Sequence, residues 1–66
     1  MKAEIIRGKL IAVDGEELTI GSSDYPEGNN YESEGLNIDE EWAKTWLGEW
    51  ADWVIIGGVI KSVRGI

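Results

Sequence analysis

Residues 37–60 read Asn-Ile-Asp-Glu-Glu-Trp-Ala-Lys-Thr-Trp-Leu-Gly-Glu-Trp-Ala-Asp-Trp-Val-Ile-Ile-Gly-Gly-Val-Ile and decide the fold. They contain all four tryptophans of the chain, and from Trp53 to Ile60 they form its most apolar run. The first part repeats its apolar residues at the helical spacing, with Ile38, Trp42 and Trp46 on one face. The stretch therefore predicts an amphipathic helix that passes directly into a buried strand. Packing in the core is the expected role of the tryptophans, with one of the four expected to stay partly exposed. They are Trp42, Trp46, Trp50 and Trp53.

The predicted helix covers residues 38–47, which is about three turns. Asn37 with Glu40 three residues later resembles a capping box at its start. Gly48 is suited to a left-handed stop after Leu47. Trp50 would still fall on the apolar face if the helix continued. The sequence therefore does not decide where the helix ends between Leu47 and Trp50.

The N-terminal part predicts a hairpin. Residues 2–13 have the character of a long strand, and Gly8 within it indicates a bulge or bend. Asp14-Gly15 is a strong signal for a two-residue turn. That turn predicts a register in which Val13 faces Glu16. The core face of the hairpin is then expected to hold Ile11, Val13, Leu18 and Ile20.

Residues 21–35 contain the only proline, many turn-forming residues and, as apolar residues, only two tyrosines. They predict a long acidic surface loop. A very short third strand is expected at Leu36–Ile38. After the helix, residues 53–56 predict a strand covered on both faces, Gly57-Gly58 predicts a bend without full chain reversal, and residues 59–64 predict the last strand.

These elements predict a single domain, residues 1–66, that is mainly β with one helix (α+β) before the last two strands. The element order resembles that of the five-stranded OB barrel, which implies a small β-barrel with the helix between its third and fourth strands. An SH3-like barrel and an open α+β sheet remain alternatives.

Composition narrows the chemistry. The chain has no cysteine and no histidine, which removes thiolate metal sites and the commonest metal ligand and general base. Its net charge is −7, and residues 21–41 carry seven acidic residues and no basic one. No catalytic constellation, cofactor motif or EF-hand spacing is present, so we expect no enzymatic activity, no cofactor and no metal.

No run approaches the length of a membrane span, and the N-terminus lacks a signal-peptide pattern. The sequence therefore predicts a soluble, small acidic protein located in the cytoplasm, with no membrane partner.

The predicted function is a non-catalytic module that binds a protein with a basic or partly apolar patch through an acidic-aromatic loop. The alternative is an OB-like single-stranded nucleic-acid-binding protein, which the excess of acidic residues disfavours. A weak homodimer is a further expectation. The residues expected to bind the protein partner are Asp24, Tyr25, Glu27, Tyr31, Glu32 and Glu34. The residues that would bind nucleic acid, if the first and last strands pair, are Lys2, Arg7, Lys9, Lys61 and Arg64.

Overall fold

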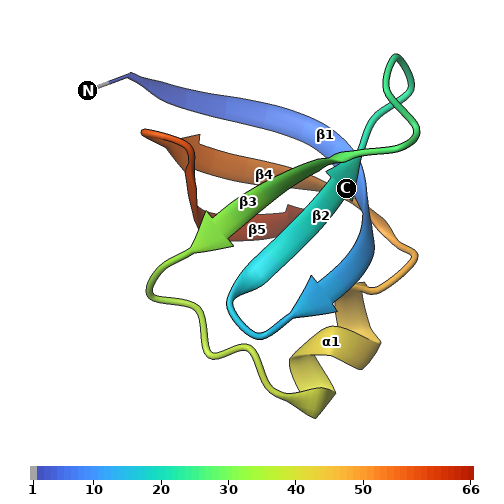
Figure 1. Ribbon diagram of the computed structural model, residues 1–66, viewed down its shortest axis with the longest axis vertical. Helices are drawn as coiled ribbons and strands as arrows, with labels where there is room; N and C mark the ends of the chain where they lie inside the picture. The colour runs from blue at the N-terminus through green and yellow to red at the C-terminus, as the bar shows by residue number, and fades with distance from the viewer. Residues whose placement is uncertain (1) are drawn as a thin grey trace.

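The computed structural model describes residues 2–66, which form five strands and one helix (Figure 1). The helix lies between the third and fourth strands. No helix within residues 2–66 is long and apolar enough to cross a membrane. In chain order the elements are β1 (Ala3–Asp14), β2 (Glu17–Gly21), β3 (Asn29–Ser33), α1 (Glu40–Trp46), β4 (Trp50–Ile56) and β5 (Val59–Gly65).

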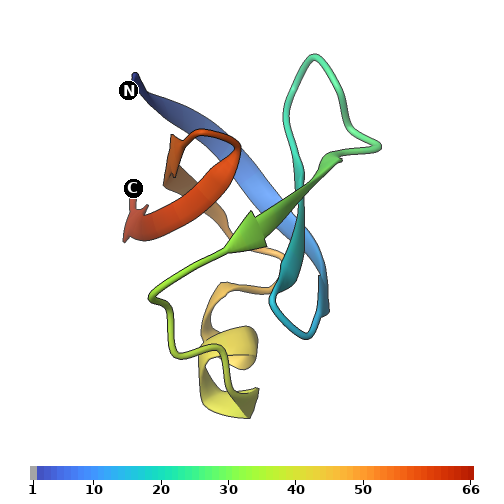
Figure 2. The same ribbon diagram turned by 60° about the vertical axis from the view of Figure 1, so that its left-hand side comes forward.

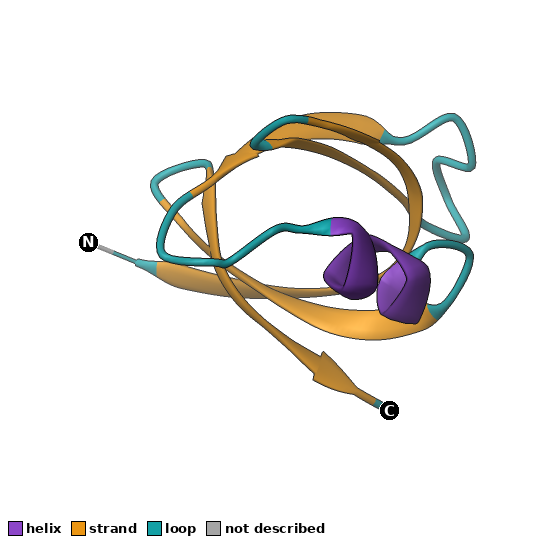
Figure 3. Ribbon diagram, turned by 90° about the horizontal axis from the view of Figure 1, so that it is seen from below, coloured by secondary structure: helices purple, strands orange, loops and turns teal. Residues whose placement is uncertain are grey.

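The five strands form one sheet that closes on itself in the order β1-β2-β3-β5-β4, and α1 lies at one end of this ring (Figure 3). β1 makes the closure possible because its first half pairs with β4 and its second half with β2. All pairings are antiparallel except that between β3 and β5, which is limited to Glu32↔Val59 and Ser33↔Ile60. The mainly β, five-stranded fold with one helix is confirmed, and the open-sheet alternative is wrong.

Trp53 is the centre of the core. Its side chain is fully buried, and its indole Nε1 donates a hydrogen bond of 3.0 Å to the carbonyl oxygen of Gly8. Trp42 and Trp46 on α1 pack against it edge to face, with ring centroids 6.2 and 6.3 Å away. Trp50 is 44% exposed, so it is the one of the four tryptophans that lies outside the core. The other buried apolar residues are Leu10, Leu18, Ile20, Ala51, Ile55 and Ile60.

The hairpin of β1 and β2 forms as predicted, but its turn lies one residue later, so Val13 pairs with Leu18 and not with Glu16. Asp14 pairs with Glu17, so the turn residues are Gly15, at a φ of 62°, and Glu16. The bulge lies between Leu10 and Ala12 and not at Gly8, where β1 pairs regularly with β4. Because a bulge shifts the alternation by one residue, Leu10 is buried and Ile11 is 43% exposed. The prediction that Ile11 lies in the core is therefore wrong.

The predicted loop at residues 21–35 contains a strand. Asn29–Ser33 form β3 by pairing with β2, from Ile20↔Asn29 to Glu17↔Glu32. Ser33 is buried, and its hydroxyl donates a hydrogen bond of 2.7 Å to the carbonyl oxygen of Glu16. Residues 36–38, where a strand was expected, have no strand structure. The loop that remains is residues 22–28.

The helix is present but shorter than predicted, and it begins later. Its N-cap is Asp39, whose carboxylate accepts a hydrogen bond of 2.9 Å from the backbone nitrogen of Trp42. The expected capping pair of Asn37 and Glu40 is therefore wrong. The helix ends at Trp46, and Gly48 has the left-handed conformation expected of the stop, with a φ of 82°.

The strand after the helix starts at Trp50, which excludes a longer helix. Its burial alternates, with Ala51, Trp53 and Ile55 inside, so the prediction of a strand covered on both faces is wrong. Gly57 and Gly58 have φ values of 60° and 80° and form a two-residue hairpin turn, closed by the pair Ile56↔Val59. The expectation of a bend without chain reversal is also wrong.

Candidate functional site

Residues 22–28, here called the finger loop, project beyond the ring of strands (Figures 1 and 2). The backbone carbonyl of Tyr25 accepts hydrogen bonds from the backbone nitrogens of Ser22, at 3.1 Å, and Gly28, at 3.0 Å. The hydroxyl of Ser22 accepts a third bond, of 3.1 Å, from the backbone nitrogen of Tyr25. These bonds hold the backbone of the loop, and the side chain of Tyr25 on it is 48% exposed to solvent.

The structure divides the six residues expected to bind a protein partner. Asp24, Tyr25 and Glu27 lie exposed on the finger loop. Tyr31 is half-buried on β3 and packs against the core. The other two acidic residues, Glu32 and Glu34, are also away from the loop, so the acidic-aromatic site reduces to three residues.

Glu34 follows β3 and accepts a hydrogen bond of 2.6 Å from the Nζ of Lys61 on β5. This bond and the charge of Lys61 lower the pKa of Glu34 below its ordinary value. Both groups are exposed in part, so the pair makes at most a modest contribution to stability. Its position beside the short β3–β5 pairing indicates that it helps to hold the ring closed.

An open groove of about 810 Å³ lies between the base of the finger loop and the connection from α1 to β4. Its apolar walls include Ile11, Leu47 and Trp50, which are 43%, 49% and 44% exposed. Large apolar side chains that share one exposed surface are typical of a binding site. The remaining lining residues are Lys9, Leu10, Gly21, Ser22, Ser23, Pro26 and Gly48.

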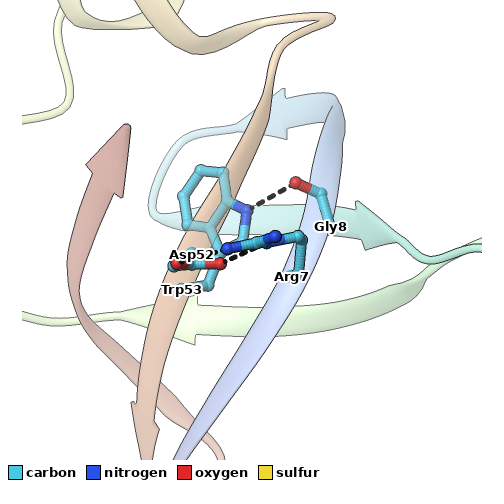
Figure 4. A network of polar contacts seen from close by, with 4 residues as sticks. All are labelled: Arg7, Gly8, Asp52 and Trp53. Carbon is cyan, nitrogen blue, oxygen red and sulfur yellow. Dashed lines mark hydrogen bonds and ion pairs between the residues drawn. The ribbon is translucent and has the colours of Figure 1, made fainter. Parts of the chain in front are cut away.

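Three of the five basic residues predicted for nucleic-acid binding share the outer face of β1, β4 and β5. Arg7 donates two hydrogen bonds, of 2.9 and 3.2 Å, to the carboxylate of Asp52 (Figure 4). Arg64 lies opposite Asp52 on β5, and the Nζ of Lys9 lies 5.8 Å from the ring centre of Trp50. Three cations and one carboxylate therefore share this face, although the whole chain is strongly acidic.

The ion pair on this face changes the acidity of both partners. The hydrogen bond and charge of Arg7, together with the charge of Arg64, lower the pKa of Asp52 below its ordinary value. The same bond raises the pKa of Arg7. Asp52 therefore stays ionised and neutralises part of the positive charge that would otherwise face a ligand.

The other two predicted basic residues lie elsewhere. Lys61 is bound to Glu34, and Lys2 precedes β1 at the exposed end of the ring. The prediction that these five basic residues lie together assumes that the first and last strands pair. This assumption is wrong, because β4 lies between β1 and β5.

The opposite outer face, on β2 and β3, is acidic. Asp14 pairs with Glu17, and Glu17 pairs with Glu32, so three carboxylates cross the sheet in one row. The pair Thr19 and Asn30 is joined by a side-chain hydrogen bond of 2.8 Å. Within residues 2–66 no group of three or more His, Cys, Asp or Glu residues is placed to hold a metal ion.

The groove was not predicted from the sequence, because the predicted core included Ile11 and the spacing of Trp50 matched the apolar face of the helix. The spacing of Trp50 and Trp53 held a signal, because residues three apart on one strand point to opposite faces. Had residue 50 been assigned to the strand, one of the two tryptophans would have been expected outside.

Neither a protein-family model, a curated protein nor a solved structure matches this chain. The function is therefore inferred from its own surface.

Proposed function

We propose that the protein is a non-catalytic protein-interaction module that engages a partner through its finger loop. The observation that carries this proposal is the hydrogen-bonded, projecting loop with Tyr25 exposed between Asp24 and Glu27. Tyrosine offers a large contact area with few rotatable bonds, and the flanking carboxylates attract a basic patch during encounter. The partner surface is therefore basic and partly apolar.

The chemistry of the carboxylates supports a binding role without catalysis. General-acid catalysis needs a carboxyl group with a raised pKa, usually in an apolar cleft. The pKa values of Glu34 and Asp52 are instead lowered by their basic neighbours. The chain also contains no histidine or cysteine to serve as base or nucleophile.

The fold within this proposal is OB-like. A parallel β3–β5 closure, a helix between β3 and β4, and a curved β1 that pairs with both β2 and β4 support it. A partly open five-stranded barrel of this kind presents loops for recognition while the strands carry the core.

The test is affinity capture from an extract of the source cells with immobilised wild type and two variants. The finger variant carries Asp24→Lys, Tyr25→Ser and Glu27→Lys, while the control variant carries Asp14→Lys and Glu17→Lys on the acidic face. We expect proteins retained by wild type and control to be lost from the finger variant. The same bound proteins on all three matrices would contradict the proposal. A variant that lacks residues 24–34 could not replace the finger variant in this test, because the deletion also removes β3.

A second candidate function is single-stranded nucleic-acid binding. It is favoured because one outer face carries Arg7, Lys9, Arg64 and Trp50. Bases would stack on Trp50 and phosphates would contact the cations. The net charge of −7 and the neutralisation of Arg7 by Asp52 oppose it. Fluorescence anisotropy with labelled oligothymidylate at low salt decides the matter, and an unchanged signal removes this candidate.

A further inference from the structure

We propose that the finger loop of one copy docks in the groove of a second copy, so that the protein forms a symmetric dimer. This inference rests on the proposed function, because it identifies the basic, partly apolar patch that the finger loop engages. The patch is on the chain itself.

The groove has the required chemistry. Among residues 2–66, Lys9 is the only charged residue that lines it. Ile11, Leu47 and Trp50 provide exposed apolar walls. Arg7, two residues before Lys9 on the same outer face, is paired with Asp52, so Lys9 supplies the positive charge of the groove. A segment that carries an aromatic ring beside carboxylates is complementary to this surface in both polarity and charge.

The finger loop is such a segment. Tyr25 supplies the ring, and Asp24 and Glu27 supply the carboxylates. The hydrogen bonds to the backbone of Tyr25 already hold the loop, so docking loses little conformational entropy. Residues 39–41 at the start of the helix present no exposed aromatic side chain beside their carboxylates, and Glu49 adjoins Trp50, which is itself a wall of the groove.

The position of the two surfaces makes the contact self-complementary. Ser22, Ser23 and Pro26 of the finger loop line the groove, so loop and groove are neighbours on one side of the molecule. A two-fold axis at their boundary places each loop over the groove of the other copy, and both contacts form together. This is the isologous arrangement of most homodimers.

The first experiment is sedimentation equilibrium of the wild type over a wide concentration range. We expect a monomer–dimer equilibrium that Lys9→Glu weakens at least about tenfold, because the new carboxylate faces those of Asp24 and Glu27 of the second copy. Lys44→Glu is the matched control, since it changes the net charge equally at an exposed helix position outside the groove. The control variant is expected to dimerise like wild type.

The decisive experiment mixes two charge-reversed variants, Lys9→Glu and Asp24→Lys/Glu27→Lys. Each is expected to be a monomer alone, because its loop and groove carry like charges. In a one-to-one mixture both contacts regain opposite charges, and a heterodimer forms. Circular dichroism of each variant verifies that it is folded, and restored association cannot come from a merely structural effect of either substitution.

Three outcomes would overturn the proposal. They are a wild type that stays monomeric at the highest concentration, a mixture of folded variants that does not associate, and a dimer that Lys9→Glu leaves intact but Ile5→Lys abolishes. The last would place the interface at β1, where residues 3–8 pair only with β4 and Ile5 is 65% exposed. A monomeric wild type whose capture still depends on the finger loop would refute the dimer and keep the proposed function.

Discussion

The interior of the ring beside α1 and the groove on its outside are both built from tryptophan and aliphatic side chains, yet they have opposite roles. Trp53 is fully buried and hydrogen-bonded, whereas Trp50, three residues earlier on the same strand, is 44% exposed. Hydrophobicity is the same in the two cases, and strand alternation decides which side chain stabilises the fold and which is free to bind. In so small a domain the outer apolar side chains cannot all be covered.

The largest expected effect is that of Trp53→Ala, because it removes the ring on which Trp42 and Trp46 pack. We expect a loss of about 3–5 kcal/mol in the free energy of unfolding. Urea denaturation followed by circular dichroism measures it. Trp50→Ala, at the groove, is the control and should change the free energy by less than about 0.5 kcal/mol. Equal losses at the two positions would contradict the division between interior and groove.

Gly8→Ala tests the inner side of β1 directly beneath the basic outer face. An added Cβ would lie 2.6 Å from the carbonyl oxygen of Gly21 and 2.6 Å from Cγ2 of Ile20. We expect a loss of about 1–3 kcal/mol, because the backbone of β2 must move. Gly65→Ala is the matched control, since the nearest atom to its Cβ would be 4.0 Å away on Trp46. Similar melting temperatures for the two variants would show that β1 at Gly8 is not tightly packed against β2.

Asp52→Asn addresses the outer face and has the smallest expected effect. Because the pKa of Asp52 is lower in the folded chain than its ordinary value of 3.8, the ion pair with Arg7 stabilises the fold above that pH. The contribution disappears as the pH falls through the folded-state pKa. The melting temperature of wild type should therefore exceed that of the variant at neutral pH, and the two should converge under acid conditions. A difference that persists in acid would mean that the side chain acts through packing and not through its charge.

Several elements could be read from local sequence. The helix followed by a strand, a turn at Gly15 and the left-handed Gly48 follow from short-range periodicity and turn chemistry. A surface loop carrying Asp24, Tyr25 and Glu27 was also readable, although it is shorter than the sequence indicates.

Other features depended on residues far apart in the chain. Asn29–Ser33 is polar and rich in turn-forming residues, and it becomes a strand because β2 on one side and β5 on the other supply its hydrogen-bond partners. The groove exists because a bulge turns Ile11 outward and because the chain leaves the helix soon enough to place Trp50 on a strand.

The sequence by itself determined the absence of histidine and cysteine chemistry and most of the kinds of element that form. The tertiary structure alone decided register, closure of the ring and the side on which each large apolar residue lies. The physical reason is that a shift of one residue in a strand exchanges its two faces, and only pairing with distant strands sets that shift.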